Sequence, residues 1–318
     1  MCCMLYRISS PMYSIILLSY FSETRIKNVF SRVSQALEQE NIPFEFIIMD
    51  DGSTDNSYQV ALELEQEDSR VHAYQLSKNY TSHYSKFAAF SLCKGNCATS
   101  IPDDEQMPLD IIIKMYRTWE KGHKIVMPFR VSRNDGKIKD AFSNLYYRLM
   151  NSITDVTFPK GGADGFLIDR EIIDILTTQI SPRNTSTTVE VLRLGFDPVF
   201  IPFERPQVKN KSRWTFRKKM KLAMDTLFSS STFPIKFISR LGFISFLFSI
   251  ILIVILAYVK LSGQQSIGGV SMPGWTSILA FVSFFSGLIL LSLGIVAEYI
   301  WKIHEEVKGR PGYIIKKK

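Results

Sequence analysis

At 318 residues, the chain is long enough for one large domain and an appended segment. Its net charge of +8 is unevenly distributed, because residues 1–204 carry 21 Lys and Arg against 26 Asp and Glu, whereas residues 205–318 carry 17 against 4. The basic residues of the second part flank apolar segments, so we expect anionic lipid headgroups as their partners and exclude nucleic acid.

Residues 1–12 contain no long apolar run, and we expect a short leader there rather than a targeting peptide. The cysteines lack the spacing of a zinc site and follow no secretory signal. We therefore expect reduced thiols at Cys2, Cys3, Cys93 and Cys97.

The first half of the chain alternates apolar runs with helical patterns. Continuous apolar runs at 13–20, 44–49 and 71–76 predict buried strands. The spacing of apolar residues predicts helices over 23–39 and 57–66. This βαβαβ order predicts an α/β fold with a mostly parallel, Rossmann-like sheet.

A first acidic turn follows the second predicted strand. Asp50, Asp51 and Gly52 come directly after the apolar run and precede Ser and Thr residues that can cap a helix. In open α/β sheets ligands bind where strands end, and carboxylates can accept hydrogen bonds from sugar hydroxyls or base N–H groups. The turn therefore indicates a nucleotide site, against the alternative of an ordinary Asp-Gly turn.

A second acidic cluster, Asp103, Asp104 and Glu105, follows a predicted strand at 98–102. Because the strand ends of one parallel sheet meet at one edge, we expect both clusters to share a crevice. Clustered carboxylates repel one another unless a cation lies between them, and their oxygen ligands suit Mg²⁺ or Mn²⁺ carrying a diphosphate. The alternative is a solvated acidic loop.

The globular part of the chain extends to residue 204 and continues the alternation of helices and strands. Asp164 lies in a glycine-rich stretch that leads into a strand, and Glu190 lies in a predicted helix. We place a cytoplasmic catalytic domain at 13–204. The further predicted elements are helices at 111–119, 141–152 and 171–176 and strands at 124–128 and 199–203.

Two long apolar segments follow. Residues 241–259 and 275–297 contain no charged residue, and each is long enough to cross a bilayer core of about 30 Å as a helix. The basic, aromatic segment 205–238 is typical of an amphipathic helix at the membrane interface. Lys and Arg flank both spans, so the positive-inside rule predicts a two-helix hairpin at 239–300, with the catalytic domain and the basic tail 301–318 in the cytoplasm. We expect a multi-pass protein of the inner, cytoplasmic membrane.

Together these motifs resemble the family 2 glycosyltransferases of GT-A fold. Within that family they resemble the membrane-anchored branch that loads a sugar onto a polyprenyl phosphate, either dolichyl or undecaprenyl phosphate. The resemblance covers residues 13–318. It is carried by the acidic turn 50–55, by 76–83 with Thr81 in place of a usual glycine, by 104–110, by 211–216 with Arg205 upstream, and by the C-terminal motifs 298–300 and 310–313.

The chain departs from the family pattern in the metal motif, which is normally Asp-x-Asp. If Gln106 sets the register, Pro102 occupies the first position, and Asp104 is the principal ligand with Asp103 assisting. A shift of one residue would instead pair Asp103 with Glu105. The usual Pro-x-Tyr-Asn-Glu ending of the first strand is also altered and has lost its Pro and Asn.

The resemblance implies an inverting, metal-dependent transfer of a sugar from a nucleotide-diphosphate donor, first of all a UDP-sugar, to undecaprenyl phosphate, for cell-envelope or O-antigen glycan modification. It implies a catalytic role for Asp104, Asp164, Glu190 and Arg213; nucleotide-sugar contacts from Tyr20, Glu23, Asp50, Asp51, Lys78 and Asp103; acceptor-phosphate contacts from Arg205, Lys211, Ser212, Arg213 and Trp214; and Mg²⁺ or Mn²⁺ at Asp103, Asp104 and Glu105.

Two other functions stay open. A family 2 enzyme that extends a lipid-linked glycan would need a carboxylate base, Asp164 or Glu190, because its acceptor is a sugar hydroxyl. A non-catalytic scaffold would keep the fold without metal-dependent binding of UDP-sugars. A homo-oligomer packed through the membrane helices is a further expectation.

Overall fold

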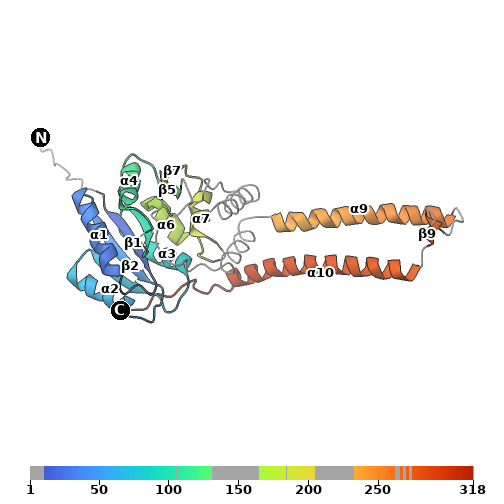
Figure 1. Cartoon of the computed structure of the whole chain (residues 1–318), viewed down its shortest axis with the longest axis horizontal. Helices are drawn as coiled ribbons and strands as arrows, with labels where there is room; N and C mark the ends of the chain where they lie inside the picture. The colour runs from blue at the N-terminus through green and yellow to red at the C-terminus, as the bar shows by residue number, and fades with distance from the viewer. Residues whose placement is uncertain are drawn as a thin grey trace. The chain divides into compact units, whose positions relative to one another are not determined.

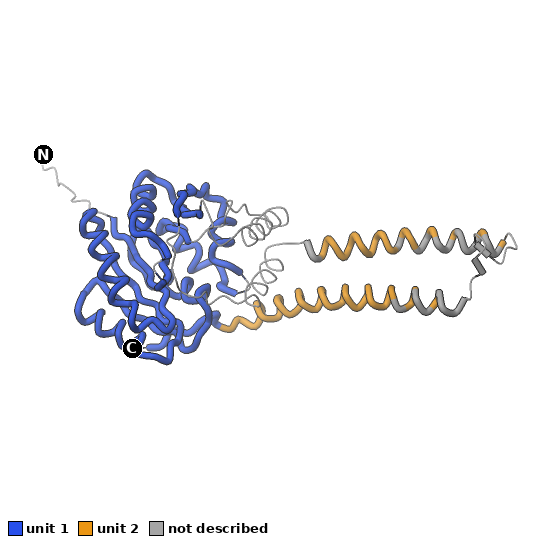
Figure 2. The backbone as a smooth tube through the Cα atoms, in the orientation of Figure 1, with its two compact units in different colours: residues 1–226, 311–318 blue, residues 227–310 orange. Residues whose placement is uncertain are grey.

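The computed structural model describes residues 11–104, 106–130, 165–183, 185–204, 233–261, 266–267, 270–271 and 274–317. The chain divides into two compact units, which are residues 1–226 with 311–318 and residues 227–310 (Figure 2). The C-terminal tail therefore belongs to the same unit as the predicted catalytic domain.

The described residues of the first unit contain one seven-stranded sheet. Its strands are β1 (Tyr13–Ser19), β2 (Phe44–Asp50), β3 (Val71–Gln75), β4 (Cys97–Pro102), β5 (Ile125–Arg130), β6 (Leu167–Asp169) and β7 (Pro198–Phe203). Their order is β3-β2-β1-β4-β6-β5-β7. Figure 1 labels β1, β2, β5 and β7. All neighbours pair in parallel except β6, which runs antiparallel to both β4 and β5. The prediction of a mostly parallel α/β sheet is confirmed.

Helices pack on both faces of this sheet, because alternate side chains of its central strands point to opposite sides. On one face, Ile15 of β1 belongs to a buried cluster with Val33 and Met115. On the other face, Ile16 belongs to a second cluster with Phe87 and Ile172. The helices of the first face are α1 (Ile26–Gln39), α2 (Ser57–Glu67) and α4 (Leu109–Trp119), and those of the second are α3 (Ser82–Phe90), α6 (Arg170–Thr178) and α7 (Thr187–Arg193).

The second unit contains two long helices, α9 (Phe233–Leu261) and α10 (Gly274–Val307), with the short strands β8 (Ser266–Ile267) and β9 (Val270–Ser271) between them in the chain. Both predicted spans are helical, although the predicted boundary at residue 238 falls inside α9. Among the described residues, one stretch is long and apolar enough to cross a membrane, Phe284–Val307 in α10. A crossing by α9, part of whose side chains lie outside the described residues, stays a prediction.

Candidate active site

The parallel register brings the ends of three strands to one edge of the sheet. Ser19 at the end of β1 pairs with Asp50 at the end of β2, and Leu18 pairs with Pro102 at the end of β4. The backbone N–H of Asp51 donates to the Ser19 carbonyl oxygen over 2.9 Å. The two acidic turns therefore flank β1 at the carboxyl edge, where open α/β sheets bind ligands.

Asp50 shapes the first acidic turn from inside the protein. Its side chain is fully buried. One carboxylate oxygen, Oδ1, accepts from the Ser53 hydroxyl, and Oδ2 accepts from the Ser53 backbone N–H and from Gln75 Nε2, each over 2.9 Å. Protein donors engage both oxygens of Asp50, so this carboxylate holds the shape of the turn. A direct contact of Asp50 with the nucleoside stays a prediction.

Gly52 lets this turn approach the next loop. Its φ is +69°, in the left-handed region that favours glycine, and an added Cβ would lie 2.4 Å from the Lys78 carbonyl carbon. The Asp50–Ser53 turn and the loop at Lys78 therefore touch backbone to backbone. No other residue type fits this position without moving one of the two segments.

We expect Gly52→Ala to lower the free energy of unfolding by at least 2 kcal/mol more than Gly122→Ala. Gly122 also has a positive φ, +95°, but an added Cβ there would meet nothing within 4 Å. Gly122→Ala therefore measures only the cost of a positive φ in a residue with a Cβ, roughly 1–2 kcal/mol. The additional loss in Gly52→Ala measures the clash with Lys78. Denaturant unfolding of both variants measures it, and equal losses would contradict the close approach.

Asp51 joins the first turn to the loop that precedes α3. It is buried, and its Oδ1 accepts from the backbone N–H of Tyr80 over 2.8 Å. Burial raises the pKa of Asp51, and the Tyr80 N–H lowers it in part. In the same loop, the exposed Lys78 ammonium lies 5.0 Å from the centre of the Tyr80 ring. Thr81 adopts φ +80°, a strained backbone for a β-branched residue.

Tyr20 and Glu23 border the same turn. The rings of Tyr20 and the exposed Phe21 lie edge to face, 4.5 Å apart. The carboxylate of Glu23 accepts from the backbone N–H of Asn56 over 3.1 Å, just before α2 begins. The structure thus places both predicted residues beside the Asp50–Ser53 turn, with Glu23 supporting the start of a helix.

Asp103 forms a buried ion pair that the sequence analysis missed. It is only 7% exposed, and its Oδ2 lies 2.6 Å from Nη2 of Arg25. The hydroxyl of Ser22 donates to the same oxygen, and Arg25 also donates to the Phe21 carbonyl oxygen over 2.6 Å. The sequence contains a signal for this pair, since Arg25 directly precedes the first turn of α1. A cation there is electrostatically unfavourable unless it has a tertiary partner.

Asp104 is the half-buried acid of the second turn, and the amide of Gln106 donates to its Oδ2. Glu105 lies outside the described residues, within which no three His, Cys, Asp or Glu side chains gather as a metal site. Arg25 offsets the charge of Asp103, and the three-acid ligand set, which includes Glu105, stays a prediction. Mg²⁺ is commonly held by one or two carboxylates together with substrate phosphates. The residues therefore fit a cation held mainly by Asp104 and a bound diphosphate.

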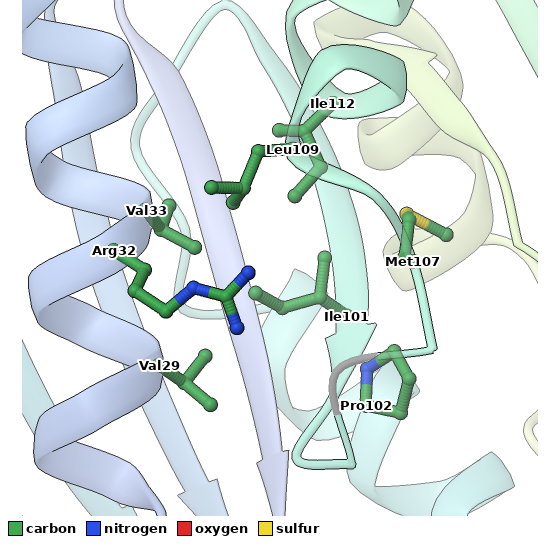
Figure 3. A pocket seen from close by; sticks show the side chains of 8 residues that line it. All are labelled: Val29, Arg32, Val33, Ile101, Pro102, Met107, Leu109 and Ile112. Atoms are coloured by element: carbon green, nitrogen blue, oxygen red, sulfur yellow. The ribbon is translucent and has the colours of Figure 1, made fainter. Parts of the chain in front are cut away.

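A small cavity lies beside Pro102, between α1 and α4 (Figure 3). Its volume of about 20 Å³ has room for roughly one water molecule. Arg32 extends from α1 across it toward Ile101 (Figure 3). The cavity is far too small for a nucleotide sugar, so it is not the donor site.

Glu190 lies on α7, apart from the two acidic turns. Its Oε1 accepts from the Thr185 hydroxyl and from Arg193 Nη1, the latter over 2.9 Å. Within the described residues, these hydrogen bonds join Glu190 to its own segment. The other predicted catalytic and acceptor residues lie outside the described residues: Asp164, Arg205, Lys211, Ser212, Arg213 and Trp214.

His83 links α3 to the segment before α7. Its Nε2 donates to the Pro182 carbonyl oxygen over 2.8 Å, and its Nδ1 accepts from the Thr187 backbone N–H over 3.2 Å. Burial, with a smaller effect from the Lys86 ammonium, lowers the pKa of His83 to about 4. A charged ring would also lose the Thr187 hydrogen bond, because Nδ1 would then carry a proton.

We expect stability to fall as the pH is lowered from about 6.5 to about 4, because the unfolded chain takes up a proton at His83 that the folded chain refuses. The loss should be on the order of 2 kcal/mol, less than full burial would cause because the ring is partly exposed. Unfolding between pH 4 and 7.5 measures it. His83→Gln should flatten the profile and His72→Gln should not; an unchanged profile in His83→Gln would contradict the assignment.

The fold and the two acidic turns define an open α/β domain with its ligand edge at the ends of β1, β2 and β4. The sequence profile of glycosyl transferase family 2 matches residues 14–176, which is just over half of the chain. The chain belongs to this family. The match runs from β1 into α6 and includes both acidic turns.

Three relatives align over nearly the whole chain. An uncharacterized glycosyltransferase of Synechocystis sp. is 28% identical over 305 residues, covering 95% of this chain and 94% of the relative. The SfII prophage-derived bactoprenol glucosyl transferase of Shigella flexneri is 26% identical, covering 96% and 97%. The undecaprenyl-phosphate 4-deoxy-4-formamido-L-arabinose transferase of Photorhabdus laumondii is 25% identical, covering 96% and 93%.

Proposed function

We propose that this glycosyltransferase moves a sugar from a nucleotide-diphosphate donor, first of all a UDP-sugar, to a polyprenyl phosphate, with inversion at the anomeric carbon. The observation that carries the proposal is the pair of acidic turns after β2 and β4, on either side of β1, in a family 2 chain that also has an apolar helical stretch, Phe284–Val307. Two full-length relatives are named for transfer to bactoprenol and to undecaprenyl phosphate, which supports the acceptor class.

The donor half of the reaction must stabilise the negative charge that develops on the departing diphosphate. Asp104 and the diphosphate would hold Mg²⁺ or Mn²⁺, which when bound supplies Lewis-acid stabilisation of this charge. Lys78 is exposed on the loop beside the first acidic turn and would contact the diphosphate or the base. Asp51 and Tyr20, at the same turn, would contact the nucleoside.

The acceptor half needs no strong general base. The second pKa of a phosphomonoester is about 6, so the attacking oxygen is already anionic at neutral pH. This oxygen forms a bond to the anomeric carbon while the bond from that carbon to the diphosphate oxygen breaks, and the nucleoside diphosphate leaves. Asp164 and Glu190 would only orient the reactants. Arg205, Lys211, Ser212, Arg213 and Trp214 would hold the acceptor phosphate at the membrane surface.

We also propose that both α9 and α10 cross the membrane. The tail 311–318 belongs to the same compact unit as residues 1–226, and the backbone N–H of Ser77 donates to the Ile314 carbonyl oxygen over 2.9 Å. Because the segments before α9 and after α10 belong to one unit, the part of the chain between them crosses a membrane an even number of times. Exposed apolar side chains along both helices, such as Phe243 and Ile289, support a lipid environment, with the first unit in the cytoplasm.

The test is a donor screen with the purified full chain in lipid nanodiscs. Labelled UDP-sugars and other nucleotide sugars are supplied with Mn²⁺ and either undecaprenyl phosphate or a lipid-linked glycan. We expect the label to enter the lipid fraction as a sugar phosphodiester with undecaprenyl phosphate alone. Transfer only to the glycan would support the extending enzyme instead, and calorimetry without metal-dependent donor binding would support the scaffold.

A further inference from the structure

The C-terminal tail pairs with the open edge of the sheet. β3 is the edge strand, and edge strands carry backbone groups that lack a partner strand. Leu76, directly after β3, forms an antiparallel bridge with Ile315. The Ser77 N–H donates to the Ile314 carbonyl oxygen over 2.9 Å, and the Lys316 N–H donates to the Gln75 carbonyl oxygen over 2.8 Å. The tail thus covers the edge just where β3 ends.

The same segment is seated between two other parts of the first unit. An added Cβ on Gly312 would lie 2.7 Å from Pro182 Cγ and 3.1 Å from Tyr84 Cε1. Tyr313 and Ile315 pack against the buried cluster that contains Leu76 and Phe87. We call residues 312–316 the C-terminal clasp.

Side chains extend this contact into the first acidic turn. Lys316 Nζ donates to Gln75 Oε1 over 2.9 Å, and Gln75 Nε2 donates to Asp50 Oδ2 over 2.9 Å. Gln75 is 8% exposed. Its amide can serve both neighbours in one orientation only, because the ammonium requires the oxygen and the carboxylate requires the NH₂ group. Asp50 in turn accepts the Ser53 backbone N–H, so a continuous chain of hydrogen bonds joins Lys316 to the turn.

We propose that the clasp is a positioning element for the donor site, and that Lys316 holds the Asp50–Ser53 turn in its binding shape through Gln75. Lys316 itself touches no substrate and is a positioning residue. The link to donor affinity rests on the proposed function, in which this turn binds the nucleoside. The apolar helix α10 ends at Val307, only a few residues before the clasp. Donor binding therefore depends on the segment that directly follows this helix.

The first arm of the test is hydrogen exchange of the full chain without any substrate. In Lys316→Ala we expect amides of residues 50–57 and 76–77 to exchange about tenfold faster than in the unaltered chain, and Lys316→Arg should restore most of the protection. The control is Lys317→Ala, which changes the neighbouring exposed lysine outside this hydrogen-bond chain. Unchanged exchange at 50–57 in Lys316→Ala would overturn the proposal, whatever the protein catalyses.

The second arm is steady-state transfer by the same variants. We expect the donor KM of Lys316→Ala to rise about five- to tenfold, with kcat within about twofold and with recovery in Lys316→Arg. A KM equal to that of Lys317→Ala would overturn the effect on donor binding. An unaltered chain that transfers no sugar would instead overturn the proposed function, and the exchange arm would still decide whether the clasp supports the turn.

Discussion

Replacing Asp104 by Asn is expected to lower kcat for sugar transfer by about 10²–10³-fold, the usual cost of losing one group that stabilises transition-state charge. The amide has nearly the same shape, so Gln106 keeps a neighbour, but it carries no charge. The charge matters here because Arg25 already offsets the other described acid of this turn, Asp103. Initial rates with saturating donor and Mn²⁺ measure the effect. Calorimetry should also show that Mn²⁺ no longer strengthens donor binding.

Asp110→Asn is the matched control. Asp110 is exposed in the first turn of α4, so its loss should cost roughly 0.3–1 kcal/mol of stability through the helix dipole and should leave the rate unchanged. An Asp104→Asn enzyme with a rate within threefold of the unaltered chain would contradict a charge-stabilising role for Asp104. Metal-dependent donor binding that survives in this variant would place the cation elsewhere.

Replacing Arg25 by Ala is expected to lower the free energy of unfolding by about 3 kcal/mol, since breaking a buried ion pair leaves a charge without compensation. The estimate is at the low end of the usual range because the Arg25 side chain is 27% exposed. The pair matters structurally because it ties the start of α1 to the end of β4, where Asp103 is almost fully buried. Denaturant unfolding in detergent measures the loss.

Two comparisons make this result specific. Arg117→Ala breaks exposed pairs with Glu40 and Glu120 and should cost less than about 1 kcal/mol. Adding Asp103→Asn to Arg25→Ala should recover part of the loss, because it removes the stranded charge. Strictly additive losses would refute the pairing. Asp103→Asn alone should lower the free energy of unfolding and leave the Mn²⁺ affinity nearly unchanged. If Asp103 were mainly a metal ligand, the Mn²⁺ affinity would fall and the free energy of unfolding would change little.

Much of the fold could be predicted because its signals are local. Continuous apolar runs such as 13–20 and 44–49 can be buried on both faces only as central strands, and helical spacing between them requires parallel crossovers. β6 is different, since a three-residue strand carries too little pattern to reveal its antiparallel direction. The carboxyl edge could be predicted too, since the ends of parallel strands meet on one side of a sheet.

The roles of individual acids at that edge were harder to predict. Asp50 and Asp51 have the same side chain and adjacent positions, yet Asp50 accepts from Ser53 and Gln75, while Asp51 accepts from the backbone N–H of Tyr80. The ion pair of Asp103 with Arg25 had no counterpart in the predicted roles, which gave Asp103 to the metal and the nucleotide sugar. The C-terminal motif 310–313 indicated the family, but no pattern in it predicted that the tail pairs with the sheet edge after β3.

The sequence by itself therefore determined the class of sheet, the position of both acidic turns at one edge of it, after β2 and β4, and the helical character of both apolar segments. Only the tertiary structure decided which donor each carboxylate accepts from. The physical reason is that strand and helix patterns arise from neighbours a few residues apart, whereas these partners lie 81 residues apart for Ser22 and Asp103 and 241 apart for Lys316 and Gln75. Such pairs become neighbours only when the sheet is assembled.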